Sequence, residues 1–161
     1  MDYQELNFLD AIRMAMEAEG KAVAFYDEAA AKTHNPLGKR LFEQLAEFER
    51  YHHTKLADLE ASLCENGACI IYEGRELSLP VPDEVSRIQE ADKMSAMGII
   101  TLAMEIKHKA EERYKALAEQ TTDATGQDMF RRLAEEEHAN HRILRDAYWS
   151  LNNRGVWAWP G

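Results

Sequence analysis

The second half of this 161-residue chain repeats the first half at a constant offset. Adding 88 to a residue number in the first half gives its counterpart in the second half without a gap, as for Tyr26 and Tyr114 (26 + 88 = 114). Further identical pairs are Ile12/Ile100, Met16/Met104, Gly38/Gly126, Phe42/Phe130, Leu45/Leu133 and Leu56/Leu144. A repeated unit buries its apolar face against its own copy. The repeat therefore predicts one domain, residues 1–161, built from two similar halves.

Each half has the pattern of two helices, because apolar residues recur at steps of three and four. Asn7 is the expected N-cap of the first helix, and Pro36 suits the first turn of the second. We expect helices over about residues 8–34, 36–63, 96–120 and 124–151, a crossover over 64–93 and a tail over 152–161. The predicted fold is all-α, a four-helix bundle of two αα-hairpins joined by one long crossover, which is the ferritin-like topology.

The charge balance argues against several classes of partner. Lys and Arg number 19 against 29 for Asp and Glu, a net charge of −10, which repels nucleic-acid phosphates and anionic lipid. No apolar run reaches the roughly 20 residues of a membrane-spanning helix, and the N-terminal MDYQELNF lacks the basic region of a signal peptide. Cys64 and Cys69 make no disulfide framework, which is typical of a reducing compartment. We therefore expect a cytoplasmic protein with no nucleic-acid or membrane partner.

Polar side chains interrupt the apolar seams of the predicted helices. Glu19, Glu49, His52 and Glu137 fall at seam positions, and on the fourth helix either Asn140 or His141 follows. Several inward carboxylates repel one another unless a cation lies between them. The spacing Glu49-x-x-His52 directs an oxygen and an imidazole from one helical face toward a common point. A metal ion is the simplest cation that fits, and the alternative is a buried ion-pair network of Glu19 with a basic side chain such as Lys107.

The runs MEAEGKAVAFYDEAA and LFEQLAEFERYHH, repeated as MEIKHKAEERYKALA and MFRRLAEEEHANH, resemble the rubrerythrin-like family of the ferritin-like, di-iron carboxylate superfamily. The resemblance covers about residues 6–63 and 94–151. It implies non-haem iron and reduction of hydrogen peroxide, and the carboxylate and imidazole ligands leave manganese or zinc as alternatives. It also assigns metal-binding roles to Glu19, Glu49, His52 and Glu137, and places Tyr26 and Tyr114 near the metal. The two tyrosines are equally compatible with ordinary core aromatics.

The second half departs from the family pattern at two positions. Lys107 stands where the repeat of Glu19 and the family both have a glutamate, and Asn140 stands in place of the expected histidine. His141 is a neighbour that could replace the lost imidazole. We therefore expect one or two ions per chain at an incomplete site. The runner-up function is a non-catalytic metal-binding or interaction bundle.

Partners are expected on two grounds. Two thiols, Cys64 and Cys69, cannot form the four-thiolate iron site of a rubredoxin module, so a redox-active chain needs an external electron-donor protein. Trp149, Trp157 and Trp159 need cover from water, which predicts that the chain forms a homodimer.

Overall fold

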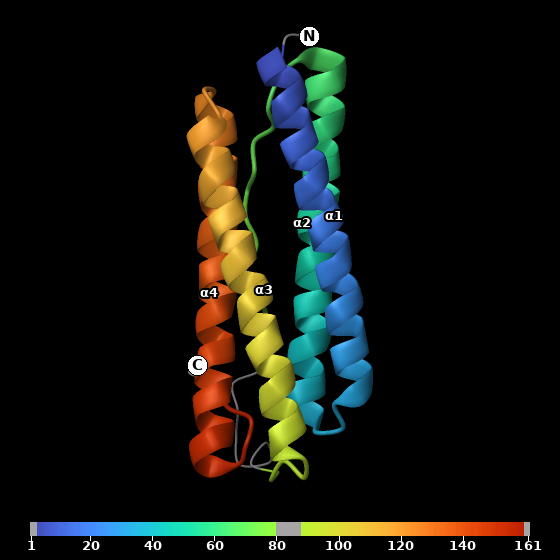
Figure 1. The fold of residues 1–161 in the computed structure, drawn as a ribbon, viewed down its shortest axis with the longest axis vertical. Coiled ribbons are helices and arrows are strands. Elements are labelled where there is room, and N and C mark those ends of the chain that lie inside the picture. Colours follow the sequence, from blue (N-terminus) through green and yellow to red (C-terminus); the bar gives the residue numbers. More distant parts are fainter. Residues whose placement is uncertain (1–2, 80–87, 160–161) are drawn as a thin grey trace.

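The computed structural model describes residues 3–79 and 88–159, and it is a bundle of four long helices (Figure 1). The helices are α1 (Tyr3–Lys32), α2 (Pro36–Asn66), α3 (Lys93–Gln120) and α4 (Ala124–Arg154). The predicted all-α, ferritin-like class is confirmed, and the described residues contain a single isolated β-bridge, between Gln89 and Val156, in place of any strand. None of the described helices is both long and apolar enough to cross a membrane.

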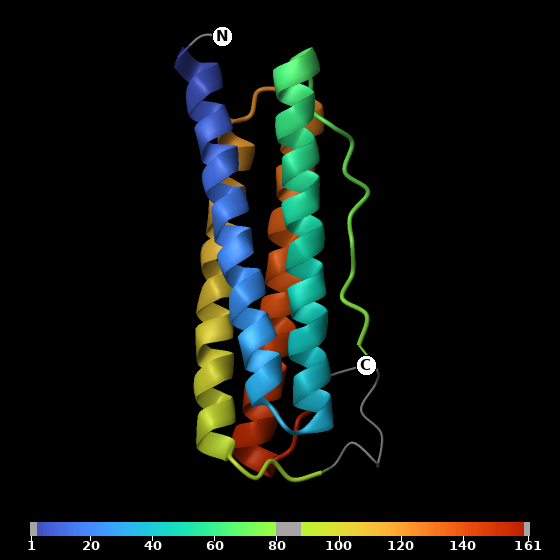
Figure 2. The ribbon, with the colours of Figure 1, turned by 90° about the vertical axis from the view of Figure 1, so that its right-hand side faces the viewer.

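The bundle consists of two antiparallel hairpins packed face to face. α1 packs along α2, α3 packs along α4, and α1 also contacts α3. Figure 2 shows the described part of the crossover descending along the outside of the bundle from the end of α2. This connection returns the chain to the end at which α3 begins, so the second hairpin lies against the first.

The caps explain where the helices begin and end. The Asn35 side chain accepts a hydrogen bond from the Leu37 amide next to Pro36, and Asp92 and Asp123 cap α3 and α4 in the same way. Gly67 (φ 67°) and Gly155 (φ 73°) take the left-handed conformation that ends α2 and α4. The expected ends near residues 63 and 151 were therefore about three residues short.

The start of α1 also differs from the prediction. The helix begins at Tyr3 rather than near Phe8, so Asn7 lies inside α1 and not at its N-cap. The physical reason is that Gln4, Glu5 and Leu6 are good helix formers with no glycine or proline among them.

The core has two apolar clusters, one toward each end of the bundle. One cluster contains Tyr26, Phe42 and Ile100, and the other contains Ile12 and Phe130. The inward polar residues lie between the two clusters, at mid-height. This position isolates them from water at both ends of the bundle.

The C-terminal tail packs on its own chain. Trp157 is 1% exposed and meets Phe42 edge to face at 5.7 Å, and Trp159 is also buried. Trp149 on α4 is 56% exposed. A partner subunit was expected because three tryptophans need cover from water. The chain itself covers two of them.

Gly38 and Gly126, a pair related by the repeat, have the same structural role. A Cβ at Gly38 would lie 2.5 Å from Trp157 Cε2 and 2.8 Å from Thr33 Cγ2, and a Cβ at Gly126 would lie 2.6 Å from Thr121 Cγ2. Each glycine thus lets the first turn of α2 or α4 approach the end of the preceding helix.

Replacing Gly38 with alanine is expected to lower the free energy of unfolding by about 1–3 kcal/mol, because the new methyl group overpacks against Trp157. The matched control is Gly98→Ala on α3, where a Cβ meets nothing within 4 Å. There the alanine should stabilise by roughly 0.5–1 kcal/mol. Urea denaturation measures both, and equal effects of the two substitutions would contradict the packing explanation.

Candidate metal centre

Three helices bring four potential metal ligands together at mid-height. Glu19 comes from α1, Glu49 and His52 from one face of α2, and Glu137 from α4. All four side chains are buried, and one donor atom from each lies within 4.8 Å of the others. Positions predicted from seam periodicity in separate helices thus meet at one point in the fold.

The imidazole of His52 lies at the centre of the cluster. Its Nδ1 atom is 3.0 Å from Glu137 Oε1, 3.7 Å from Glu49 Oε2 and 3.9 Å from Glu19 Oε1. Imidazole nitrogen and carboxylate oxygen together suit iron, manganese or zinc.

Lys107 from α3 supplies a fixed positive charge beside these ligands. Its side chain is fully buried, and its ammonium contacts Glu49 and lies 3.1 Å from Glu137 Oε2. Burial alone would lower the pKa of Lys107, but the carboxylates of Glu137 and Glu49 overcome that effect and raise it well above its ordinary value. The sequence suggested two places for this ammonium, beside Glu19 or toward Glu137. The structure confirms the contact with Glu137 and adds Glu49 as a second partner.

Each of the four ligand residues keeps at least one buried donor atom that makes no hydrogen bond. These atoms are Glu19 Oε2, Glu49 Oε2, His52 Nδ1, Glu137 Oε1 and Glu137 Oε2. An unsatisfied polar atom in a dry core costs about 1–3 kcal/mol, and more if it is charged. A cation bound among them would satisfy the whole group.

The charges fit one divalent ion better than two. As metal ligands the three carboxylates would carry three negative charges, and the Lys107 ammonium cancels one of them. One divalent ion neutralises the remainder. A second ion would bring excess positive charge to a buried site that lacks the two further ligands of the family pattern, because Lys107 and Asn140 occupy those positions.

Glu136 and Tyr72 are functional neighbours that the sequence analysis missed. Glu136 Oε1 lies 3.1 Å from His52 Nε2 and accepts a hydrogen bond of 2.5 Å from the Tyr72 hydroxyl. With Nε2–H donated to this carboxylate, Nδ1 is the ring atom left to bind metal. One available signal for Glu136 was its repeat counterpart, Phe48, since an acid replaces an aromatic residue there.

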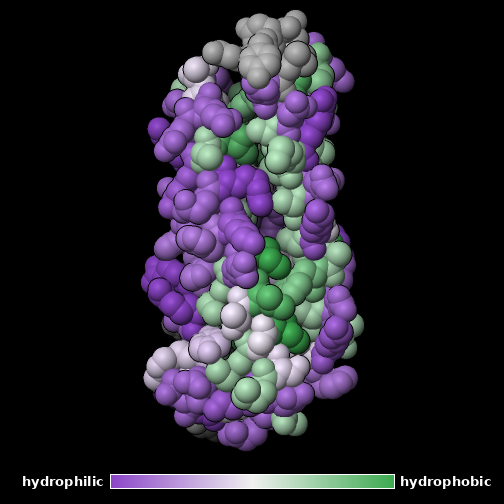
Figure 3. All heavy atoms as spheres, in the orientation of Figure 1, coloured by the Kyte–Doolittle hydropathy of each residue, from purple (hydrophilic) through white to green (hydrophobic). Residues whose placement is uncertain are grey.

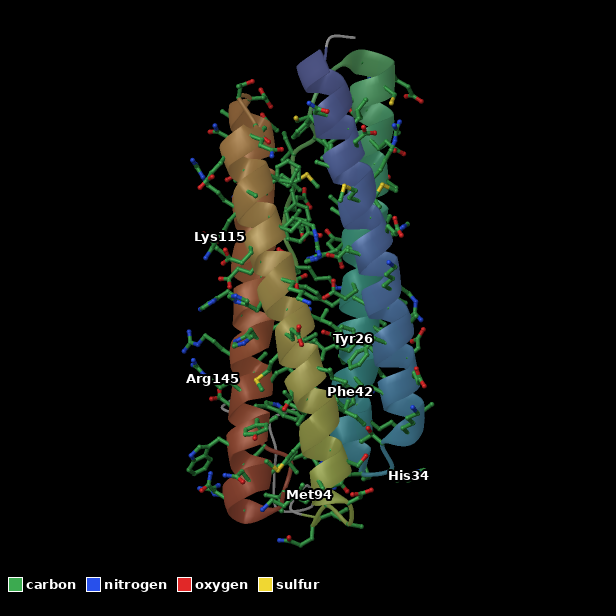
Figure 4. The ribbon with its side chains drawn as sticks, viewed as in Figure 1. Tyr26, His34, Phe42, Met94, Lys115 and Arg145 are labelled. Carbon is green, nitrogen blue, oxygen red and sulfur yellow. The ribbon has the colours of Figure 1, made fainter. Side chains whose placement is uncertain are left out.

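The other predicted neighbours divide into two groups. The Tyr114 hydroxyl donates a hydrogen bond to Glu19, and the buried Tyr26 hydroxyl and Asn140 Nδ2 make none. Figure 4 shows Tyr26 in the interior of the bundle. His141 is half-buried and is absent from the set of converging donor atoms, so it does not fill the place of the lost histidine.

Burial and mutual repulsion shift the protonation of the cluster. Burial, followed by the nearby charge of Glu49, raises the pKa of Glu19 to about 7. Burial alone would lower the pKa of His52, but Glu136, Glu137 and Glu19 raise it well above its ordinary value. Without a metal ion, protons therefore supply part of the positive charge that the cluster requires.

Comparison with known proteins shows a family similarity in the first half of the chain. A family model described as Rubrerythrin matches residues 3–68, which include Glu19, Glu49 and His52. The predicted rubrerythrin-like resemblance is confirmed over these residues. A search of curated proteins gives no match.

One solved structure resembles nearly the whole chain. It is a hypothetical protein from Pyrococcus furiosus, 24% identical, with a TM-score of 0.73 over 93% of both chains. At that identity the likeness establishes the fold alone.

Replacing Lys107 with methionine should lower the free energy of unfolding of the metal-free protein by about 3–5 kcal/mol, because it leaves Glu49 and Glu137 buried without their cation. Lys109→Met is the matched control on α3, since Lys109 is exposed and pairs only with Glu105 among the contacts described. Chemical denaturation in the presence of a chelator measures both variants. Similar small losses for the two would show that Lys107 is not a required counter-ion.

Proposed function

We propose that this chain binds one divalent metal ion between Glu19, Glu49, His52 and Glu137, with Lys107 in place of a second ion. The observation that carries the proposal is the set of five buried donor atoms without a hydrogen bond, His52 Nδ1 and four carboxylate oxygens of Glu19, Glu49 and Glu137. The rubrerythrin-like resemblance of residues 3–68 favours iron, with manganese or zinc as alternatives. Iron bound there supplies a one-electron redox change and a Lewis acid.

The residues around the site bind, orient and transfer protons. The three carboxylates neutralise the ion, and Glu136 orients His52 through Nε2. Glu136 also lines a groove of about 580 Å³ between the crossover and α4, together with Arg75 and Asn140. While no ion is bound to Nδ1, this arrangement gives a proton from solvent a short route through Glu136 to the imidazole.

The same arrangement predicts weak peroxide chemistry. Reduction of hydrogen peroxide to two waters consumes two electrons and two protons, and the charge balance leaves room for one ion. We therefore propose slow peroxide reduction with an external electron-donor protein. The second candidate function, a non-catalytic metal-binding or interaction bundle, is favoured by the buried contacts of Lys107.

Association as a homodimer remains a proposal, now on other grounds than the tail tryptophans. Figure 3 shows a mainly hydrophilic face with apolar side chains gathered on its lower middle part. α3 exposes Met94 and Leu102, and α4 exposes Trp149. A symmetric partner could cover such residues, and sedimentation velocity measures the mass in solution.

The double change Lys107→Glu with Asn140→His should raise the core from one metal ion to two, and should raise the peroxidase rate with it, because it restores a carboxylate and an imidazole. Elemental analysis measures the metal bound per chain. The amount bound in the core is the difference between a protein with an intact core and one that carries Glu49→Gln and His52→Ala together. Lys109→Glu controls for the charge reversal. A wild-type core that already holds two ions, and gains nothing from the double change, would contradict the one-ion proposal.

Metal affinity should increase as the pH rises from about 6 to 8. The pKa of Glu19 is raised to about 7 and that of His52 is raised well above its ordinary value, so bound protons compete with the ion at the lower pH. Each displaced proton contributes up to about tenfold per pH unit. Calorimetry in buffers of different ionisation enthalpy counts the protons released, and a count of zero at pH 7 would contradict this protonation scheme.

A further inference from the structure

The outer side of the α3–α4 hairpin carries metal-ligating side chains that the first half of the chain lacks. His108, Glu111 and His138 correspond through the repeat to Gly20, Val23 and Arg50. At each of these three positions the second half has an imidazole or a carboxylate where the first half has neither. Because the two halves share one fold, the first half is an internal reference for what this helix pair requires structurally.

Glu111 is shared by two sets of contacts, one with His138 across the two helices and one with its neighbours on α3. His138 Nδ1 on α4 lies 2.8 Å from Glu111 Oε1 on α3. Donor atoms of His108, Glu111 and Glu112 all lie within 4.8 Å of one another. Figure 4 shows Lys115 and Arg145 on this outer side of the α3–α4 pair, which Figure 3 shows as largely hydrophilic.

Glu111 is the unusual member of the group. Only 12% of its side chain is exposed, at a position where the repeat has an apolar valine. It lines a groove of about 590 Å³ together with His138. Lys115 Nζ lies 3.5 Å from Glu111 Oε1 and 3.7 Å from Glu112 Oε1, and its exposed chain can move into solvent when another cation binds.

We propose that His108, Glu111 and His138 form a second metal site, separate from the core, for a divalent first-row transition ion such as Zn²⁺. Two imidazoles and a carboxylate are a ligand set typical of zinc, and Glu112 is a fourth candidate. The site shares no residue with the core cluster, so it does not depend on the proposed function. An ion bound there joins α3 to α4 and stabilises the second hairpin.

The test titrates Zn²⁺ into the metal-free full-length chain by calorimetry. Wild type is expected to bind one equivalent at the core and one at the surface. His108→Ala with His138→Ala should lose one equivalent, or weaken it at least a hundredfold, and should lose part of the rise in Tm that Zn²⁺ produces. The matched control, His34→Ala with His53→Ala, removes two other accessible imidazoles and should bind as wild type does.

The core variant Glu49→Gln with His52→Ala separates this proposal from the proposed function. It should keep the surface equivalent, and circular dichroism checks that it is folded. If zinc binding by the His108/His138 variant matches wild type, or if the core variant binds no zinc while folded, the surface site is wrong. If the core variant instead binds as wild type does, the core proposal fails and the surface site stands.

Discussion

A buried ammonium ties three of the four helices together at mid-height. Lys107 on α3 contacts Glu49 on α2 and Glu137 on α4, in a layer between two apolar clusters. Removing charges from water is costly, so such a layer persists only when every charge has a partner. The ammonium permanently supplies one of the positive charges that the carboxylates need. The remaining carboxylate charge and the imidazole determine which further cation can bind in this layer. The geometry of the candidate metal centre follows from this constraint.

The two halves of the repeat differ in where their candidate metal ligands lie. The first half retains Glu19, Glu49 and His52 inside the bundle, and it is the half that the Rubrerythrin model matches. The second half keeps Glu137 inside but has Lys107 and Asn140 at the other two corresponding positions. Its remaining candidate ligands, His108, Glu111 and His138, lie on its outer side. The first half alone supplies three of the four candidate core ligands.

The repeat and the helical periodicity were sufficient to predict the bundle and the inward positions of Glu19, Glu49, His52 and Glu137. Both rest on local spacing, which a sequence states directly. Glu136 and Tyr72 were missed because their contact joins α4 to an irregular crossover, and no periodicity relates such segments. The helix ends at Gly67 and Gly155 were missed although the glycine signal was present. The cover over Trp157 was also unpredictable, since it depends on how the tail folds back over Phe42.

The contact between the crossover and Glu136 links two parts of the molecule that are usually considered separately. The Tyr72 hydroxyl and the Arg75 amide both donate hydrogen bonds to the carboxylate that also holds His52. A change in the charge on the imidazole therefore alters how strongly Glu136 holds the crossover. The hydrogen-exchange rates of the crossover amides should therefore depend on whether a proton or a metal ion is bound in the core.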